Sequence, residues 1–341
     1  MPEPLIITGA PGSPYTRKML AALRYRRLPH IFISDLDASR RLPQPRVKLW
    51  PVAYFHEPDG SLAPMTDSTP ILRRLEAEHA ARRIVPADPA LAFLDALVED
   101  FADEWLTKAM FHYRWTYRAD IDNAARVLPS WFVSPLDDAR LADEGATFAA
   151  RQISRLGVVG SSAGTADAIE SSFCALIDIL DRHFAVSPFL WGDRPGAADF
   201  GLAGQLTQLA LFDPTPAALV RARAPRVLSW TIAMEDLSGW DRSAWAAPER
   251  APTTISDLLA EIGATYAPLL LANAEAIGRG ETHFEAGVRG RLWRQSVFPY
   301  QLKCLRALQA QYSDLSNAER ASLDPLLIGS GCERLFGKEP S

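Results

Sequence analysis

The sequence has little of what marks several common classes of protein. Its 341 residues include three cysteines, which are too few and too scattered for a disulfide framework or a metal cluster: Cys174, Cys304 and Cys332. Lysine and arginine number 36 against 41 aspartates and glutamates, so no basic excess indicates a nucleic-acid partner. The sequence contains no run of about 18 apolar residues, which is the length expected of a membrane-spanning helix. These absences favour a reducing, cytoplasmic location and predict no metal, nucleic-acid or membrane partner.

What the sequence does have is the composition of a packed globular protein. Hydrophobic residues make up 48% of the chain and charged residues 23%, which excludes a disordered chain. Residues 1–7 contain no basic residue and only a short apolar stretch, so we expect no signal peptide. At about 150 residues per domain, the length predicts roughly two domains.

The first 80 residues alternate between strand-like and helix-like patterns. Short apolar runs predict strands at residues 5–8, 30–33, 51–55 and 61–64. Helical patterns follow Ser13 and Asp67, and residues 35–48 form a loop with one helical turn. The order is βαβ followed by ββα, which predicts a small α/β domain over residues 1–82.

Beyond a proline-containing linker at residues 84–89 the patterns become helical. One long pattern rich in aromatic residues covers 91–117, and others follow near 138–156, 165–184, 198–212 and 226–237. Proline and glycine separate these segments, and no strand-like alternation stands out. We therefore predict an all-α domain over residues 90–240.

The remaining residues, 241–341, predict a mostly helical extension. Helical patterns cover residues 255–277, 300–312 and 317–328, and a partial two-residue rhythm over 282–297 fits a β-hairpin. Apolar and aromatic residues such as Tyr266 and Trp293 predict that the extension packs on the α domain.

A hydroxyl stands where the first predicted strand passes into a helix. Ser13 takes the N-cap position and Pro14 the first helical position. The unpaired N–H groups and the positive dipole end of a helix suit an anion. Ser13 therefore either caps the helix only or also contacts an anionic ligand.

Two further segments carry weaker signals of the same kind. A proline that enters a strand, such as Pro51, lies at a sheet edge or follows a cis peptide. A cis bond, which we expect here over the ordinary trans alternative, turns the Trp50 backbone outward, where it can pair with a peptide-like ligand. Asp67 caps the third helix, and Ser68 lies in its first turn, another place that suits an anion. Alone, this last pair marks only a helix start.

The three signals together, in this order within a βαβ–ββα unit, resemble the thioredoxin-like domain of the glutathione S-transferase superfamily over about residues 4–80. The resemblance is to its serine-type members, and it implies that Ser13 faces the sulfur of glutathione as the catalytic residue. It implies that Trp50 and Pro51 pair with the cysteinyl backbone of the tripeptide. It also implies that Asp67 and Ser68 hold the γ-glutamyl end.

The helical part carries a resemblance of its own. Residues 189–193 and 198–200 resemble the loop into the family's central buried helix, and residues 225–230 resemble the helix that follows. Gly196 stands where the family usually has serine or threonine, which predicts a weakened helix cap. Asp67 stands where glutamate is commoner, which shortens the reach towards the γ-glutamyl end.

The resemblance implies a second, electrophilic substrate between the two domains. Candidate residues for this substrate pocket are Tyr15, Phe111, His112 and Trp115. The five ring-bearing side chains within residues 111–117 cannot all face one side of a helix with 3.6 residues per turn. The alternative is that this helix buries its rings in the core.

The role that the resemblance implies for Ser13 requires only a small shift in the pKa of the glutathione thiol. A thiol with a pKa of about 8.5 is mostly protonated at neutral pH, and a hydroxyl hydrogen bond to a charged group is worth about 1.5–3 kcal/mol. Such a bond lowers the thiol pKa by roughly one to two units. Serine is then a donor rather than a nucleophile, because no residue near it in sequence looks like a base. The sequence does not favour dithiol exchange, which needs cysteine, since positions 13 and 16 are serine and threonine.

The sequence therefore predicts a glutathione S-transferase-like enzyme in which Ser13 activates the glutathione thiolate against an unidentified electrophile. Glutathione is the co-substrate and no metal is expected. The alternative is a non-catalytic glutathione-binding or partner-binding protein on the same fold. The resemblance also implies a homodimer. Arg17 and Lys18 either attract the anionic tripeptide or lie on a solvated face.

Overall fold

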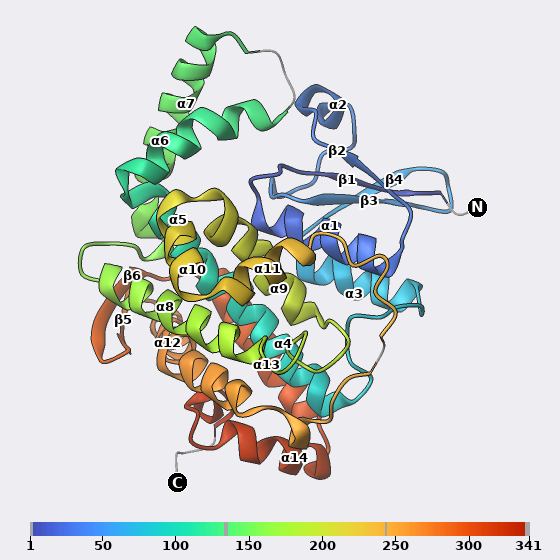
Figure 1. The fold of residues 1–341 in the computed structure, drawn as a ribbon, viewed down its shortest axis with the longest axis vertical. Coiled ribbons are helices and arrows are strands. Elements are labelled where there is room, and N and C mark those ends of the chain that lie inside the picture. The colour runs from blue at the N-terminus through green and yellow to red at the C-terminus, as the bar shows by residue number, and fades with distance from the viewer. Residues whose placement is uncertain (1–2, 133–135, 243, 338–341) are drawn as a thin grey trace.

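The computed structural model describes residues 3–132, 136–242 and 244–337. Its first part is a mixed sheet in the order β2-β1-β3-β4, with β1 (Leu5–Thr8), β2 (His30–Ile33), β3 (Val52–His56) and β4 (Leu62–Thr66). Strand β2 is parallel to β1, while β3 is antiparallel to β1 and β4. The helices are α1 (Pro14–Arg26), the short α2 (Leu36–Arg40) and α3 (Ser68–Glu78). Helices α1 and α3 lie between the sheet and the helical part (Figure 1).

The next part is helical, as predicted. Its helices are α4 (Pro89–Phe101), α5 (Thr107–Thr116), α6 (Arg118–Val127), α7 (Asp138–Ile153), α8 (Ala166–His183), α9 (Ala197–Leu206), α10 (Pro214–Arg223) and α11 (Pro225–Ala233). A π-helical turn, Ala102–Leu106, joins α4 to α5, so the long predicted helix is one continuous helical run. Helices α6 and α10 were not predicted. The predicted combination of a thioredoxin-like domain and a helical domain is confirmed, while the exact domain limits stay predictions.

Helix α9 is the central helix, and all ten of its residues are buried. Helix α1 packs directly on it. The contact is close because a Cβ added at Gly204 would lie 2.5 Å from the carbonyl oxygen of Pro14 and 3.0 Å from Cβ of Lys18. A glycine at this position therefore lets the first turn of α1, which follows Ser13, lie against the core.

The start of α9 is capped by a side chain from another helix. The carboxylate of Asp95, on α4, accepts hydrogen bonds from the backbone N–H groups of Ala197 and Ala198, each at 3.1 Å. A Cβ on Gly196 would lie 2.2 Å from Oδ1 of Asp95. The prediction of a weakened cap is therefore wrong, because the glycine makes room for a carboxylate that replaces the missing hydroxyl.

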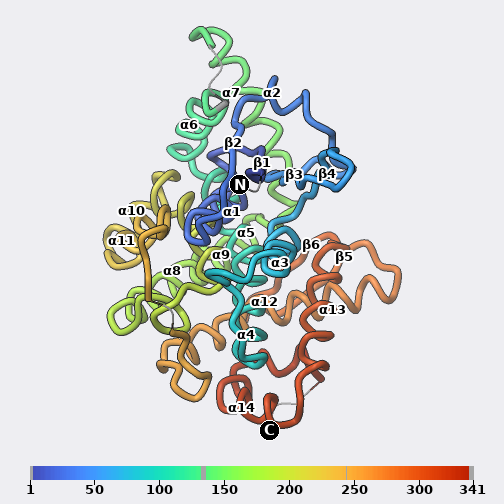
Figure 2. Tube along the Cα trace, turned by 90° about the vertical axis from the view of Figure 1, so that its right-hand side faces the viewer, coloured from blue at the N-terminus to red at the C-terminus, as the bar shows by residue number. Residues whose placement is uncertain are grey.

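The C-terminal extension comprises α12 (Thr253–Gly278), β5 (His283–Val288), β6 (Arg291–Ser296), α13 (Pro299–Asp314) and α14 (Asn317–Leu327). Strands β5 and β6 pair antiparallel, so the predicted hairpin is confirmed. Helix α12 packs on α8 and on the hairpin, and α13 packs on α4 and α12 (Figure 2). Trp293 and Tyr266 of the extension share one hydrophobic cluster with residues of both preceding parts.

Helix α12 is long and apolar enough, by length and composition, to cross a membrane. In the most apolar 18-residue stretch of this helix, 67% of the residues are buried. Pro268 and Tyr266 in the middle of this helix are among the buried residues, as in the core helix of a globular protein. The burial accounts for its apolar composition without a membrane.

The Gly204→Ala substitution tests the close packing of α1 on α9. We expect it to lower the free energy of unfolding by about 1–3 kcal/mol, because the new methyl group overlaps the Pro14 carbonyl. Chemical denaturation measures the change. Gly239→Ala is the matched control, since a Cβ there meets no atom within 4 Å. Equal stability of the two variants would contradict the packing described here.

Candidate functional site

The pairing register brings the three segments singled out from the sequence to one edge of the sheet. Thr8, at the end of β1, pairs with Val52 at the start of β3, and Val52 pairs with Thr66 at the end of β4. The loop into α1, the segment before β3 and the turn into α3 therefore leave the sheet side by side. The expected cis peptide between Trp50 and Pro51 is confirmed.

Ser13 is the N-cap of α1. Its Oγ accepts a hydrogen bond from the backbone N–H of Thr16 at 3.3 Å. This bond uses a lone pair of Oγ and leaves the hydroxyl proton, for which the described part of the chain provides no acceptor. Capping the helix and donating to an anion are thus compatible roles for the same side chain.

The loop before Ser13 is held by two arginines. Nε of Arg17 donates to the carbonyl oxygen of Pro11 at 2.9 Å, and Arg114 donates to the carbonyl of Gly12 at 3.5 Å. The backbone N–H of Ser13 donates to the carbonyl of Ala10 at 2.9 Å. The sequence predicted that Arg17 either attracts the tripeptide or lies on a solvated face. The structure gives it a role that was not predicted, which is to fix the conformation of this loop.

Lys18 lies in a buried ionic network rather than on a solvated face. Its Nζ is 2.8 Å from Glu99 and 2.5 Å from Asp103, and Arg73 is 2.6 Å from Glu99. The hydroxyl of Thr69 lies 3.3 Å from carboxylate oxygens of both acids. Two cations thus balance two anions. Lys18 is only 1% exposed, so the expectation that it attracts the tripeptide or faces solvent is wrong.

The network joins the two helices whose starts form the site. Lys18 belongs to α1, Arg73 belongs to α3, and the two acids lie on α4 and the π-helical turn. Although burial opposes ionisation of Glu99, the charges of Arg73 and Lys18 lower its pKa to about 2. The carboxylate therefore stays charged at neutral pH and fixes α1 and α3 relative to one another.

Asp67 is the N-cap of α3, and its backbone is unusual. Its φ of 78° and ψ of 117° are rare for a residue other than glycine, and its carboxylate accepts from the backbone N–H of Thr69 at 3.4 Å. Such a conformation costs about 1–3 kcal/mol and tends to persist at functional sites. Ser68, the next residue, is buried in the first turn of the helix. The hydroxyl of Tyr300, from α13, donates to Oδ2 of Asp67 at 2.5 Å.

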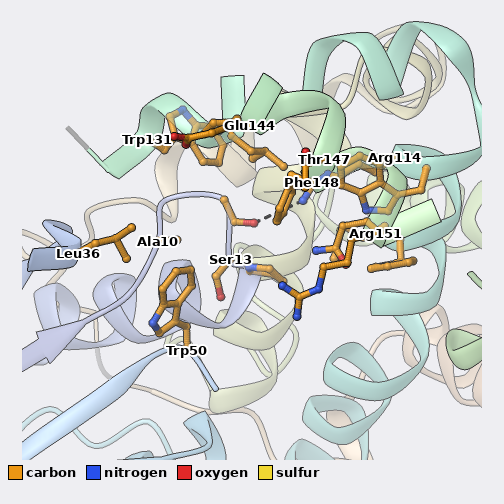
Figure 3. Close-up of a pocket in the computed structure, with 18 of the residues that line it drawn as sticks. Ala10, Ser13, Leu36, Trp50, Arg114, Trp131, Glu144, Thr147, Phe148 and Arg151 are labelled. Atoms are coloured by element: carbon orange, nitrogen blue, oxygen red, sulfur yellow. Dashed lines mark hydrogen bonds between the residues drawn. The ribbon is translucent and has the colours of Figure 1, made fainter. Parts of the chain in front are cut away.

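A cavity of about 980 Å³ opens beside Ser13 (Figure 3). This volume is at the upper end of the range of about 300–1,000 Å³ for ligand pockets. Four other residues predicted for the site also line it: Tyr15, Trp50, Phe111 and Trp115. Pro51, Asp67 and Ser68 are not among the residues that line this cavity.

The opposite wall of the cavity was not predicted. It comes from α7 and the 3₁₀ turn Leu128–Phe132, which follow α5 and α6, and it includes Trp131, Phe148 and Arg151 (Figure 3). A Cβ on Gly12 would lie 2.2 Å from the Trp131 ring, so this wall reaches the residue next to Ser13. This wall was not predicted because the sequence around Ser13 does not indicate that α7 and the 3₁₀ turn, which lie far along the chain, will pack beside it.

His112 is not part of the cavity lining, contrary to prediction. Its ring nitrogens lie 2.8 Å from Oγ of Ser161 and 3.0 Å from a carboxylate oxygen of Glu170. Phe111 and Trp115 are four residues apart and share the helix face that lines the cavity. His112 follows Phe111 and therefore points about 100° away from that residue around the helix axis. The prediction that the rings of this segment face different sides is confirmed, but His112 was assigned to the wrong side.

Tyr15 lines the cavity and is anchored at its hydroxyl. The hydroxyl donates to the backbone carbonyl of Asp103 at 2.8 Å. Burial and the nearby acidic residues raise the pKa of Tyr15 well above its usual value, so the ring stays neutral. The side chain therefore offers the cavity an apolar face and not an acid or a base.

The comparisons with known proteins define the family of the N-terminal domain. Residues 7–83 match the family model described as glutathione S-transferase, N-terminal domain. These residues hold Ser13, the cis peptide and Asp67, so the predicted superfamily is confirmed for this part of the chain. No curated protein matches the chain significantly.

Solved structures of low sequence identity also resemble the chain. Poplar glutathione transferase F1 is 16% identical, with 70% of this chain and 95% of that chain covered and a TM-score of 0.42. A Burkholderia graminis glutathione transferase, solved with two glutathione molecules bound per subunit, is 16% identical, with coverages of 68% and 83% and a TM-score of 0.41. A Methylobacterium radiotolerans glutathione S-transferase in complex with glutathione sulfonate is 18% identical, with coverages of 71% and 100% and a TM-score of 0.42. Because these identities and TM-scores are low, the assignment of the N-terminal domain to its family rests on the match of residues 7–83 to the family model.

The Lys18→Met substitution tests the buried network. We expect the free energy of unfolding to fall by about 3–5 kcal/mol, because two buried carboxylates lose their shared cation. Urea denaturation followed by circular dichroism measures the loss. Lys48→Met, at an exposed position, is the control and should change stability by no more than about 0.5 kcal/mol. A loss below about 1 kcal/mol for Lys18→Met would contradict the network's structural role.

Proposed function

We propose that the protein is a glutathione S-transferase-like enzyme in which the Ser13 hydroxyl stabilises the thiolate of glutathione for attack on an electrophile. The observation that carries the proposal is the position of Ser13. It caps α1 with its proton still available, and it lines a large cavity within a domain whose sequence matches this family.

The proposed role of Ser13 rests on two physical contributions. The hydroxyl donates to the anionic sulfur, a bond worth about 1.5–3 kcal/mol, and the start of α1 adds up to about 1 kcal/mol by its dipole. Arg17 and Arg114 hold the preceding loop, so the hydroxyl does not need to be ordered when glutathione binds. The bound thiol is then ionised to a useful extent at neutral pH.

The rest of glutathione is proposed to lie along the sheet edge. The backbone of Trp50, before the cis bond, pairs with the cysteinyl residue, and Pro51 fixes the direction of that backbone. The Asp67 carboxylate accepts from the ammonium group of the γ-glutamyl residue. Ser68, in the first turn of α3, suits the neighbouring carboxylate because the N–H groups of a helix start favour an anion.

The electrophile is proposed to occupy the cavity beside Ser13. Its floor and walls are largely aromatic and aliphatic, including Phe111, Trp115, Trp131 and Phe148. We further propose a cytoplasmic homodimer with domains at 1–82, 90–240 and 241–341.

The Ser13→Ala substitution tests the proposal. We expect the rate of glutathione conjugation across a panel of electrophiles to fall roughly 10- to 100-fold, because the hydrogen bond to the sulfur is lost. Ser13→Thr, which keeps a hydroxyl, should restore part of the rate. The assay is the rate of thioether formation at neutral pH.

A second variant separates catalysis from helix capping. Asp88→Ala removes the N-cap of α4, where Oδ1 accepts from the backbone N–H of Leu91 at 2.8 Å. It should cost about as much stability as Ser13→Ala, typically about 1 kcal/mol, with unchanged turnover. Turnover that does not depend on Ser13 would contradict the mechanism. Glutathione binding without turnover on any electrophile would support the non-catalytic alternative, and no binding would reject both.

A further inference from the structure

The C-terminal extension reaches the candidate site at one residue. Tyr300 is the second residue of α13, and its hydroxyl donates to Oδ2 of Asp67, 233 residues earlier in the chain. A hydrogen bond between side chains thus joins the helix starts of α3 and α13. Tyr300 is 37% exposed, so this contact lies at the surface of the site and not in the core.

The start of α13 is anchored on both sides of Tyr300. Asn273, on α12, donates to the carbonyl of Phe298 at 3.0 Å and accepts from its backbone N–H at 2.8 Å. On the other side, Gln301 donates to Glu104 at 3.3 Å. Tyr300 is therefore held in position by its neighbours, and its hydrogen bond to Asp67 does not depend on a free loop.

The hydroxyl of Tyr300 is a permanent donor. Partial burial of the hydroxyl end, together with the hydrogen bond to Asp67 and the charge of that carboxylate, raises the pKa of Tyr300 far above its usual value, so the hydroxyl keeps its proton at physiological pH. Asp67 is then oriented by two donors, with the Thr69 N–H on Oδ1 and Tyr300 on Oδ2. A carboxylate oxygen has two lone pairs, so each oxygen can still accept from a further donor.

We propose that Tyr300 is a positioning residue for the amino end of glutathione: it holds the Asp67 carboxylate in the orientation that accepts the γ-glutamyl ammonium group. This inference rests on the proposed function. The short side chain of Asp67 makes orientation important, because a misplaced carboxylate does not reach the ligand. The extension, which follows both predicted domains, thereby contributes to recognition of the co-substrate.

The test compares two ligands that differ only at the γ-glutamyl end. Glutathione carries this group, and the dipeptide cysteinylglycine lacks it. Isothermal titration gives the dissociation constant of each ligand for the wild-type protein, Tyr300→Phe and the control Tyr312→Phe. Tyr312 lies three turns further along α13, where its ring packs on Phe93 and Phe336.

We expect Tyr300→Phe to weaken glutathione binding about 3- to 10-fold, as for a lost hydrogen bond that orients a charged group, and to leave the dipeptide unchanged. KM for glutathione should rise with little change in kcat. Tyr312→Phe should leave the dissociation constants of both ligands unchanged. In Asp67→Asn, adding Tyr300→Phe should have almost no further effect, because the two residues act as one unit.

Three outcomes would overturn the inference. Unchanged or tighter binding of glutathione by Tyr300→Phe would mean that Tyr300 does not assist Asp67. Equal weakening of glutathione and the dipeptide would mean that the substitution only disturbs the fold. Absence of glutathione binding by the wild-type protein would overturn the proposed function as well, whereas the first two outcomes leave that function intact.

Discussion

The candidate site depends on the buried amino group of Lys18, which lies between the carboxylates of Glu99 and Asp103. This contact attaches α1 to the first long helix of the helical part, and Arg73 attaches α3 to Glu99. Ser13 caps one of these helices and Asp67 caps the other. The relative position of the proposed sulfur-binding and amino-binding groups is therefore fixed by a buried charge network. Removing one partner of such a network leaves a buried charge unpaired, which is strongly destabilising.

Around this network the chain adds two elements on opposite sides. The 3₁₀ turn Leu128–Phe132 and α7 bring Trp131 and Phe148 to the cavity beside Ser13. The C-terminal extension packs along α4 and α8 and brings Tyr300 to Asp67. In the proposed function, one addition faces the second substrate and the other faces the co-substrate, while the sheet edge between them carries the groups that the family match covers.

Much of this architecture was predictable because its signals are local. The strands, the cap at Ser13 and the hairpin all follow from neighbouring residues whose spacing matches the period of a strand or helix. Apart from helices α6 and α10, the features that were missed are contacts between distant segments. Gly196 suggested a weak cap because Asp95, about a hundred residues earlier, gives no sign that its carboxylate will replace the hydroxyl. The same holds for Tyr300, whose partner lies 233 residues away. His112 failed for a different reason: ring spacing shows that faces differ, but not which face meets the cavity.

The central claim is that Ser13, at the start of α1, stabilises a thiolate. The most direct measurement is the pH titration of the thiol of protein-bound glutathione, followed by the ultraviolet absorbance of the thiolate. The account predicts a pKa about one to two units below that of free glutathione for the wild-type protein and for Asp88→Ala, and a return towards the free value for Ser13→Ala. A bound thiol whose pKa equals that of free glutathione in the wild-type protein would contradict the account.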